Sequence, residues 1–380
     1  MADDLIYRLW FANRANPTNK HLRQIFMKIR DPLAIYGMSG AEFNAFYPLD
    51  ERTYNRLNDK SLEKEKEITE EAAAKNINII SYDDERYPER LKNIETFPYI
   101  LYHKGEYYDF SDILSIAVVG TRNPSDYGYK AAVSISRELA YNNVLVVSGM
   151  AMGVDAAAHY AAMSIGKPTA AVLGSGPDVI QPVCNKKLYE YMSENGCIYS
   201  EYPPGTVGIA RNFPARNRII SGLCVGVLVV EAGRKSGSLI TADFALEQGK
   251  DIFAVPNMIN NPKGEGTNKL IKEHAIPVTC AKDILDEYSL LIKDIKNIRD
   301  DGISKECDAE DFLSRFDDLT PLEREVASFM KKEPASVNFI SSLSNIPVDK
   351  VLSVMTMLEI KGVVRSENGN KFGLNTERND

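Results

Sequence analysis

Two short segments carry residues that suit the binding of phosphate groups. Gly120-Thr121-Arg122 combines a glycine, a hydroxyl and a guanidinium before a predicted helix, and Lys235-Ser236 precedes another. Free N–H groups at a helix N-terminus bind anions, and arginine binds phosphate oxygens through paired hydrogen bonds. We interpret both segments as phosphate-contacting loops. A tight turn with a surface arginine, or glycines that only allow close packing, would explain the same residues structurally.

The run from Phe213 to Ile220 adds groups that suit bases. Phe213 offers an aromatic face, and Arg216-Asn217-Arg218 places an amide between two guanidinium groups. Arginines for phosphates, with an aromatic ring and an amide for bases, are typical of grooves that bind single-stranded nucleic acid. The alternative is structural: Arg216 forms a buried ion pair with Glu201 or Glu231.

A further loop, Ser148–Asp155, contains glycines that would let a ligand approach the backbone closely. We count Ser148, Gly149 and Gly153 among the candidate binding residues. Asp155 and His159 lie four residues apart on the next predicted helix, a spacing that could serve acid–base chemistry. We favour a capping and helix-surface pair instead, because no nucleophile lies nearby in the sequence.

Several common functions do not fit these motifs. The segment Glu231–Thr241 breaks the order of a Walker A loop, so ATP hydrolysis is not indicated. No Gly-x-Gly-x-x-Gly follows the first strand, which argues against a dinucleotide site. The five cysteines form no Cys-x-x-Cys pair, and we expect buried free thiols rather than a disulfide framework or a zinc site. We predict no catalytic residue, no metal and no cofactor.

These motifs follow short apolar runs that alternate with helix-length segments. The pattern is that of a doubly wound α/β domain with a mostly parallel sheet, whose ligand crevice lies outside the carboxyl ends of the strands. The predicted strands are Ile116–Val119, Val144–Val147, Thr169–Leu173, Ile198–Ser200, Val227–Val230 and Ile252–Val255. The predicted helices between them include Tyr127–Ala140, Val154–Ile165 and Leu239–Gln248.

The chain has 380 residues and a net charge of −8, which seems at first to disfavour a nucleic-acid partner. Most of that charge is local: residues 283–318 hold 12 Asp and Glu against five Lys and Arg. Residues 205–237 hold five Lys and Arg against Glu231 alone. Charge on the crevice side matters more than the total. No apolar run reaches 18 residues and the first residues are acidic, so we expect a cytoplasmic protein without a membrane segment.

The two ends of the chain predict smaller modules. Apolar spacing interrupted at Pro17, Pro32 and Pro48 indicates short helices over residues 1–62. We expect a charged helix over Glu63–Lys75, a strand over Ile77–Tyr82 and a loop-rich stretch over Asp84–Leu101. Three helices and a hairpin around an Asn-Gly turn indicate a winged helix near the end, which serves either DNA or protein contacts. The expected domains are residues 1–62, 63–292 (the core), 293–318 (an acidic linker) and 319–376.

In this order and spacing, the motifs resemble the DNA-processing protein A (DprA, or Smf) family over nearly the whole chain. The resemblance implies an extended Rossmann-like core, a helical domain similar to a sterile alpha motif, and a winged helix. It implies a cytoplasmic homodimer that is not an enzyme, binds and protects incoming single-stranded DNA during natural transformation, and helps to load RecA. The glycine-arginine loop and the Arg-Asn-Arg helix of the family line the DNA groove, which corresponds to Arg122, Arg216 and Arg218 here.

The alternative function is enzymatic, because related Rossmann-like proteins cleave nucleoside monophosphates. They use a Pro-Gly-Gly-x-Gly-Thr loop followed by a catalytic glutamate. The comparable segment here, Lys235–Thr241, has neither the double glycine nor that glutamate. We therefore favour the DNA-binding function.

Overall fold

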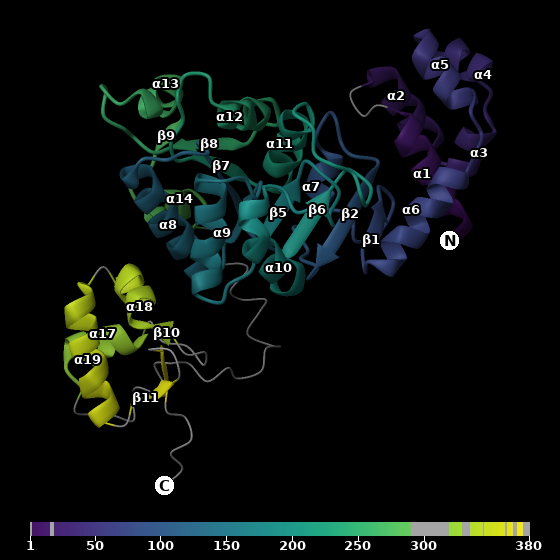
Figure 1. Ribbon diagram of the computed structural model, residues 1–380. Helices are drawn as coiled ribbons and strands as arrows, with labels where there is room; N and C mark the ends of the chain where they lie inside the picture. Colours follow the sequence, from purple (N-terminus) through teal and green to yellow (C-terminus); the bar gives the residue numbers. More distant parts are fainter. Residues whose placement is uncertain are drawn as a thin grey trace. The chain divides into compact units, whose positions relative to one another are not determined.

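The computed structural model describes residues 2–15, 19–289, 319–328, 335–344, 346–361, 363–367 and 371–374. The chain divides into two compact units, residues 1–298 and 299–380 (Figure 1). The predicted boundaries at residues 62 and 292 remain predictions, and the predicted acidic linker, residues 293–318, lies outside the described residues.

The first unit is built on a nine-stranded sheet with the order β1-β2-β6-β5-β4-β3-β7-β8-β9. The strands from β6 to β9 in that order run parallel, whereas β2 is antiparallel to both β1 and β6. The strands are β1 (Asn78–Ser81), β2 (Ile100–Gly105), β3 (Ser115–Val119), β4 (Leu145–Ser148), β5 (Thr169–Leu173), β6 (Cys197–Ser200), β7 (Gly226–Val229), β8 (Asp251–Ala254) and β9 (Ile276–Pro277). The predicted mostly parallel, doubly wound sheet is confirmed.

Helices cover both faces of this sheet because its central strands are apolar on both sides. Alternate residues of β3 show this: Ala117 and Val119 join one core, with α11 and α12, while Ile116 and Val118 join the other, with α8, α9 and α14 (Figure 1). The helices of this region are α7 (Glu89–Lys92), α8 (Asp126–Tyr141), α9 (Val154–Ser164), α10 (Lys186–Asn195), α11 (Asn212–Leu223), α12 (Gly237–Glu247), α13 (Glu265–Lys272) and α14 (Ala281–Glu287).

The N-terminal residues form the predicted short helices. Side chains of Asn19, Asp31, Ser39 and Asp50 cap four of them by accepting N–H groups of the following turn. The helices are α1 (Ala2–Arg14), α2 (Lys20–Ile29), α3 (Pro32–Gly37), α4 (Gly40–Phe46), α5 (Glu51–Asn58) and the charged α6 (Glu63–Ala74). Helices α1 to α5 share one apolar core with the sheet, whereas Ile68 and Ala72 of α6 pack in a separate cluster that includes Ile100 and Tyr102 of β2.

One prediction about this unit was incomplete and one was wrong. The stretch Asp84–Leu101 is loop-rich, as predicted, but it also contains the short helix α7 and the start of β2, a strand that was not predicted. The run Ile100–Tyr102 is buried, but it is too short to be distinguished from a buried loop by its sequence pattern. The cysteines are not all buried: Cys197 and Cys224 are, whereas Cys184 and Cys280 are exposed.

The second unit has the predicted winged-helix elements. They are α17 (Pro321–Ser328), α18 (Val337–Ser344), α19 (Val348–Ile360) and the strands β11 (Val364–Glu367) and β12 (Lys371–Leu374). A short strand that the sequence pattern did not reveal, β10 (Ala335–Ser336), pairs with β12. In the parts of the chain that are described, no helix is long and apolar enough to cross a membrane.

Candidate functional site

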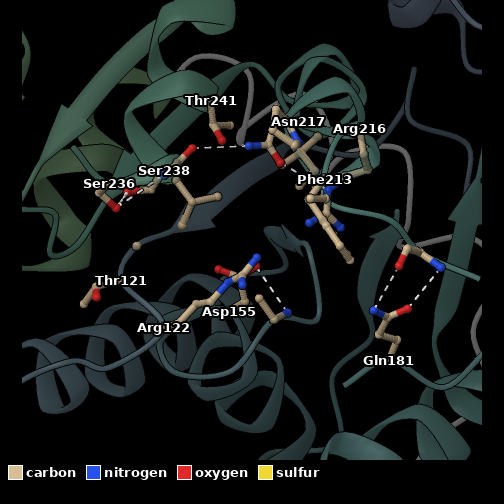
Figure 2. A pocket seen from close by; sticks show the side chains of 18 residues that line it. Thr121, Arg122, Asp155, Gln181, Phe213, Arg216, Asn217, Ser236, Ser238 and Thr241 are labelled. Carbon is tan, nitrogen blue, oxygen red and sulfur yellow. Dashed lines mark hydrogen bonds between the residues drawn. The ribbon is translucent and has the colours of Figure 1, made fainter. Parts of the chain in front are cut away.

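A cavity of about 630 Å³ opens at the carboxyl ends of the parallel strands (Figure 2). The loops after β3 and β4 and the N-terminal turns of α11 and α12 form its walls. Its lining residues are Val119, Gly120, Thr121, Arg122, Ala151, Asp155, Gln181, Gly208, Ala210, Phe213, Pro214, Arg216, Asn217, Ile220, Ser236, Gly237, Ser238 and Thr241. Seven of the twelve predicted site residues therefore line one cavity: Gly120, Thr121, Arg122, Phe213, Arg216, Asn217 and Ser236.

Arg122 and Phe213 meet in this cavity, although 90 residues separate them in the chain. The guanidinium carbon of Arg122 lies 5.7 Å from the centre of the Phe213 ring. Arg122 is exposed and forms no ion pair or hydrogen bond with any described side chain or backbone group. A cation beside an aromatic face, without an acid to neutralise it, is suited to a phosphate and its base.

Arg216 lines the same cavity but is 5% exposed. Its Nη1 donates to the carbonyl oxygen of Gly149 at 2.9 Å and to that of Val172. Burial, with Arg122 nearby, lowers the pKa of Arg216 to about 10 despite the opposing effect of Asp155. Arg216 forms no ion pair with Glu201 or Glu231, so the structural alternative does not hold in that form. The guanidinium instead joins two strand ends.

Asp155 and His159 do not lie on the surface, so that part of the prediction was wrong. Asp155 is buried and accepts the N–H groups of Gly149 at 3.1 Å and Ala151 at 3.4 Å, which fixes the loop after β4. Burial raises the pKa of Asp155, opposed chiefly by Arg216. His159 is fully buried, with Nδ1 2.7 Å from Oγ1 of Thr169. Helix α9 packs against the sheet through Val154, Ala157, Ala158 and Ala162, and Asp155 and His159 are buried with them.

Ser148, Gly149 and Gly153 do not line the cavity. The hydroxyl of Ser148 is buried and donates to the carbonyl oxygen of Val118 at 2.6 Å. A Cβ on Gly149 would lie 2.5 Å from Nη2 of Arg216. Gly153 has φ +78°, and a Cβ there would lie 2.5 Å from the carbonyl oxygen of Thr121. The structure gives these three residues a role in packing the loops around the cavity.

Arg218 and Lys235 also lie outside this cavity. Arg218 is 3% exposed, and its Nη2 lies 2.6 Å from the Glu201 carboxylate while its Nε donates to the carbonyl oxygen of Thr96 at 2.7 Å. The ion pair that we considered for Arg216 therefore belongs to Arg218. Lys235 is exposed, and Ser236 caps the N-terminus of α12 through Ser238.

Sequence reasoning missed Gln181, which helps to close the cavity. Its side-chain amide accepts from the Gly208 N–H at 3.1 Å and donates to the Gly208 carbonyl at 3.2 Å (Figure 2). This pair joins the loop after β5 to the loop after β6. Gln181 carries no charge and follows no strand directly, so no feature of the sequence marked it.

The cavity offers little for catalysis. Asp155 is the one carboxylate among its lining residues, and its oxygens already accept two backbone N–H groups. The described residues contain no group of three His, Cys, Asp or Glu side chains that could hold a metal ion. The fold and the site together define a doubly wound α/β protein with a cationic, aromatic-lined groove at its strand ends, followed by a winged helix.

The comparisons with known proteins give the family. Residues 78–289, more than half of the chain, match the family described as DNA recombination-mediator protein A, and residues 316–370 match the DprA winged helix domain. The chain belongs to this DprA/Smf family.

Two similar proteins illustrate the relationship, the first of them by both sequence and structure. The chain is 43% identical to the DNA processing protein DprA of Streptococcus pneumoniae over 205 residues, which are 54% of this chain and 72% of that protein. The X-ray structure of DprA from S. pneumoniae superposes with a TM-score of 0.65 at 33% identity, covering 74% of this chain and 97% of that one. A structure of DprA from Helicobacter pylori, described for its unique single-stranded DNA binding mode, superposes with a TM-score of 0.52 at 30% identity. The match covers 57% of this chain and 96% of that one.

Proposed function

We propose that this protein binds single-stranded DNA in the cavity at the strand ends. The observation that carries the proposal is the pairing of Arg122, which has no acidic partner among the described residues, with the half-buried ring of Phe213. Arg122 would neutralise a phosphate, Phe213 would stack on a base, and the side chain of Asn217 would bond to a base edge. Thr121 and Ser236 would add hydroxyl contacts. None of these contacts reads a base strongly, so binding would depend little on sequence.

The relatives support this proposal, since one is a DNA processing protein and the Helicobacter pylori protein has a single-stranded DNA binding mode. From the family we further propose a mediator of recombination that protects incoming DNA and helps to load RecA during natural transformation in the cytoplasm. A RecA strand-exchange assay tests this role. The protein should speed RecA filament formation on DNA covered by a single-strand binding protein, and absence of any effect would oppose the mediator role.

We also propose a homodimer that forms around residues 252–292, at the edge of the sheet closed by β9. The apolar spacing of Ile284 and Tyr288 in the sequence suggested a helix face for a partner, but that expectation was wrong. Both side chains are buried in the core of their own chain. The apolar surface in this region is instead at Met258 and Ile259, which are 75% and 97% exposed. Light scattering at micromolar concentration should give the mass of two chains, and that of one chain would contradict the dimer.

Direct tests separate the DNA-binding function from a nucleotide-cleaving one. The protein is titrated with labelled oligo-dT, and separately incubated with nucleoside monophosphates while free base is assayed. Tight oligonucleotide binding without base release is expected. Base release without oligonucleotide binding would reverse the conclusion. Asp155, the one carboxylate that lines the cavity, would then be the candidate catalytic acid, although it already accepts two backbone N–H groups.

A further inference from the structure

A second cavity, of about 770 Å³, lies between the N-terminal helices and the sheet. Helix α5 contributes Arg52 and Arg56 to one wall, and the start of α11 contributes Arg211 to the other. The first cavity uses no residue of the N-terminal helices. The second cavity is therefore a separate site within the same unit.

The two cavities share the first turns of α11. Along the chain, Ala210 lines the first cavity, Arg211 and Asn212 the second, Phe213 and Pro214 the first, and Ala215 the second. The alternation continues with Arg216 and Asn217 on the first and Arg218 on the second. The first turns of α11 therefore form a wall that is common to both cavities.

The second cavity has an excess of positive charge. Its acids are already engaged: the Asp50 carboxylate accepts the N–H and hydroxyl of Thr53, and Glu201 is paired with Arg218. Arg52 and Arg211 are exposed and have no hydrogen bond or ion pair to any residue that the structure describes. Their side chains are free to meet an anion.

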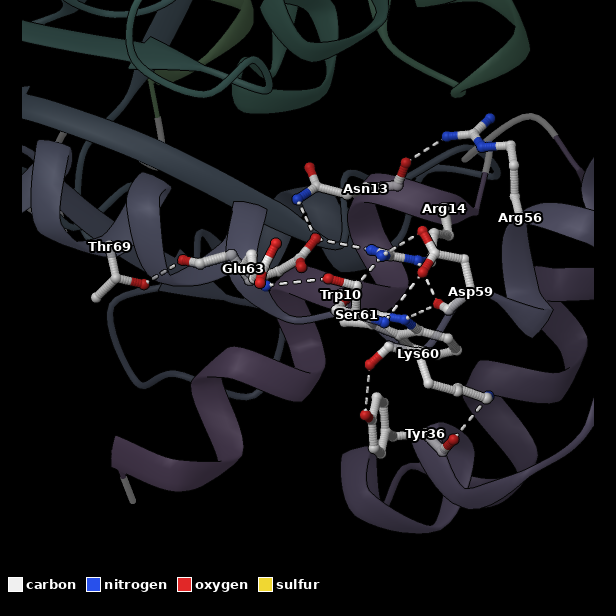
Figure 3. Close-up of polar contacts among 11 residues, drawn as sticks. Trp10, Asn13, Arg14, Tyr36, Arg56, Asp59, Lys60, Ser61, Glu63 and Thr69 are labelled. Atoms are coloured by element: carbon white, nitrogen blue, oxygen red, sulfur yellow. Dashed lines mark hydrogen bonds and ion pairs between the residues drawn. The ribbon is translucent and has the colours of Figure 1, made fainter.

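Neighbouring groups hold the arginine wall in place (Figure 3). The guanidinium of Arg14 lies 2.8 Å from the buried Glu65 carboxylate and 3.1 Å from Asp59. Arg56 donates to the carbonyl oxygen of Asn13, one residue before Arg14. Burial and the like charges of Arg52 and Arg14 lower the pKa of Arg56, as expected where positive potential is not cancelled locally. These contacts hold Arg56 against α1, beside the ion-paired Arg14, while the side chain of Arg52 stays free.

Aromatic groups complete the cavity. Tyr99 lines it, is 3% exposed, and has a buried hydroxyl without a hydrogen-bond partner among the described residues. A buried hydroxyl with no partner costs free energy, which a ligand acceptor would recover. Tyr202 and Phe244 also line the cavity and are partly exposed, so their rings can stack on a base.

We propose that this second cavity binds a further nucleotide segment of the same single strand that occupies the first. Arg52 and Arg211 hold its phosphates from opposite walls, Tyr202 or Phe244 stacks on a base, and Tyr99 donates to a phosphate or base oxygen. The N-terminal helices thus become part of the DNA-binding surface. This inference rests on the proposed function of the first cavity and extends it.

The test uses the full chain and a ladder of oligo-dT lengths, with affinity and salt dependence measured at each length. For the native protein, affinity should rise again once the oligonucleotide is long enough to leave the first cavity. Arg52→Ala and Arg211→Ala break no contact of the folded chain, so both variants should keep the native melting temperature. Each should lower the affinity for long oligonucleotides on the order of tenfold and the salt slope by about 0.7. Neither should change binding of the shortest oligonucleotides that bind.

The matched control is Lys66→Ala, which removes an exposed cation of α6 that lines neither cavity. It should bind like the native protein at every length. The inference is overturned if Arg52→Ala and Arg211→Ala match this control, or if they weaken short and long oligonucleotides equally. Failure of the first cavity gives a different result: Arg122→Ala would then leave binding unchanged at all lengths.

Discussion

At the scale of single residues, the arginines near the groove divide into one exposed cation and two buried ones. We predict that Arg122→Ala lowers the magnitude of the single-strand salt slope by about 0.7 and the affinity on the order of tenfold. The reason is that the variant loses one phosphate contact, while no hydrogen bond or ion pair of the described structure is broken. Filter binding across a salt series measures both quantities. Arg234→Ala, also an exposed arginine but outside the cavity, serves as the control.

Arg218 should behave in the opposite way, because its charge is used inside the protein. Arg218→Ala leaves the Glu201 carboxylate without its partner and is expected to lower the free energy of unfolding by about 3–5 kcal/mol. Urea denaturation measures this loss. The salt slope for short oligonucleotides should stay at the native value in the protein that remains folded. A lowered slope with unchanged stability would show that Arg218 contacts phosphate after all.

His159 predicts how stability depends on pH. The Thr169 hydroxyl donates to the carbonyl oxygen of Val146 and so accepts from Nδ1 of His159, while Nε2 has no partner among the described residues. Burial lowers the pKa of His159 to about 3. The unfolded chain therefore binds the proton first as pH falls.

The free energy of unfolding should consequently drop by about 1.4 kcal/mol for each pH unit as pH falls from roughly 6.5 to 3. Above pH 6.5 this group should cause no change of stability with pH. Urea midpoints measured over this range test the prediction. His159→Leu should lose stability at neutral pH but show a flatter acid limb. An identical pH profile in both proteins would falsify the assignment.

At the scale of elements, Glu231 joins three segments behind the groove. Its fully buried carboxylate accepts the N–H of Ser125 at 2.7 Å and its hydroxyl at 2.6 Å, where α8 begins. It also accepts from the side chains of Asn257 at 3.2 Å and Asn261 at 3.4 Å, in the loop after β8. The end of β7 is thereby held against both loops.

We predict that Glu231→Ala lowers the free energy of unfolding by about 3 kcal/mol, because four part-buried donor groups lose their charged acceptor at once. Chemical denaturation followed by circular dichroism measures the change. Glu247→Ala on the exposed side of α12 is the matched control and should stay within about 0.5 kcal/mol of the native value. Equal stability of the two variants would mean that water can replace this network.

At the scale of the whole molecule, both cavities lie in the first unit, and the described side chains of α19 in the second unit offer little to a phosphate backbone. The side chains on the exposed part of α19 include Leu352, Met357 and Ile360, and its basic residue is Lys350. Lys361, just after the helix, lies 2.8 Å from the Glu323 carboxylate. This composition favours a protein contact over a duplex contact.

We therefore predict that a chain ending at residue 298 keeps the affinity and salt slope of the full chain for oligo-dT. Fluorescence anisotropy measures the affinity of both proteins. Circular dichroism shows whether the shorter protein is folded, and light scattering shows whether it has the same oligomeric state. A folded, unchanged assembly that no longer binds would place the DNA contacts in the second unit and reject both cavities.

The sequence by itself determined the sheet and the loops that end its strands. Buried runs such as Thr169–Leu173 can be recognised locally. A strand that is covered by helices on both faces needs apolar side chains along its whole length, and this leaves a continuous apolar run in the sequence. Glycine before Arg122 and proline near the start of α11 mark turns in the same local way. The motifs that were predicted to follow strands lie together at one edge of the sheet, because parallel strands bring all their carboxyl ends to the same edge.

Only the tertiary structure decided which of these residues face the cavity. Arg216 and Arg218 are two apart on one helix and point to different sides of it, but the packing of α11 between two cavities fixed which side each one meets. Glu201 reached Arg218 rather than Arg216 because β6 ends beside that side of the helix. Gln181, Arg52 and Tyr99 were brought to the cavities by contacts between distant segments. Local pattern carries no record of such contacts, because their free energy arises only when the chain has folded.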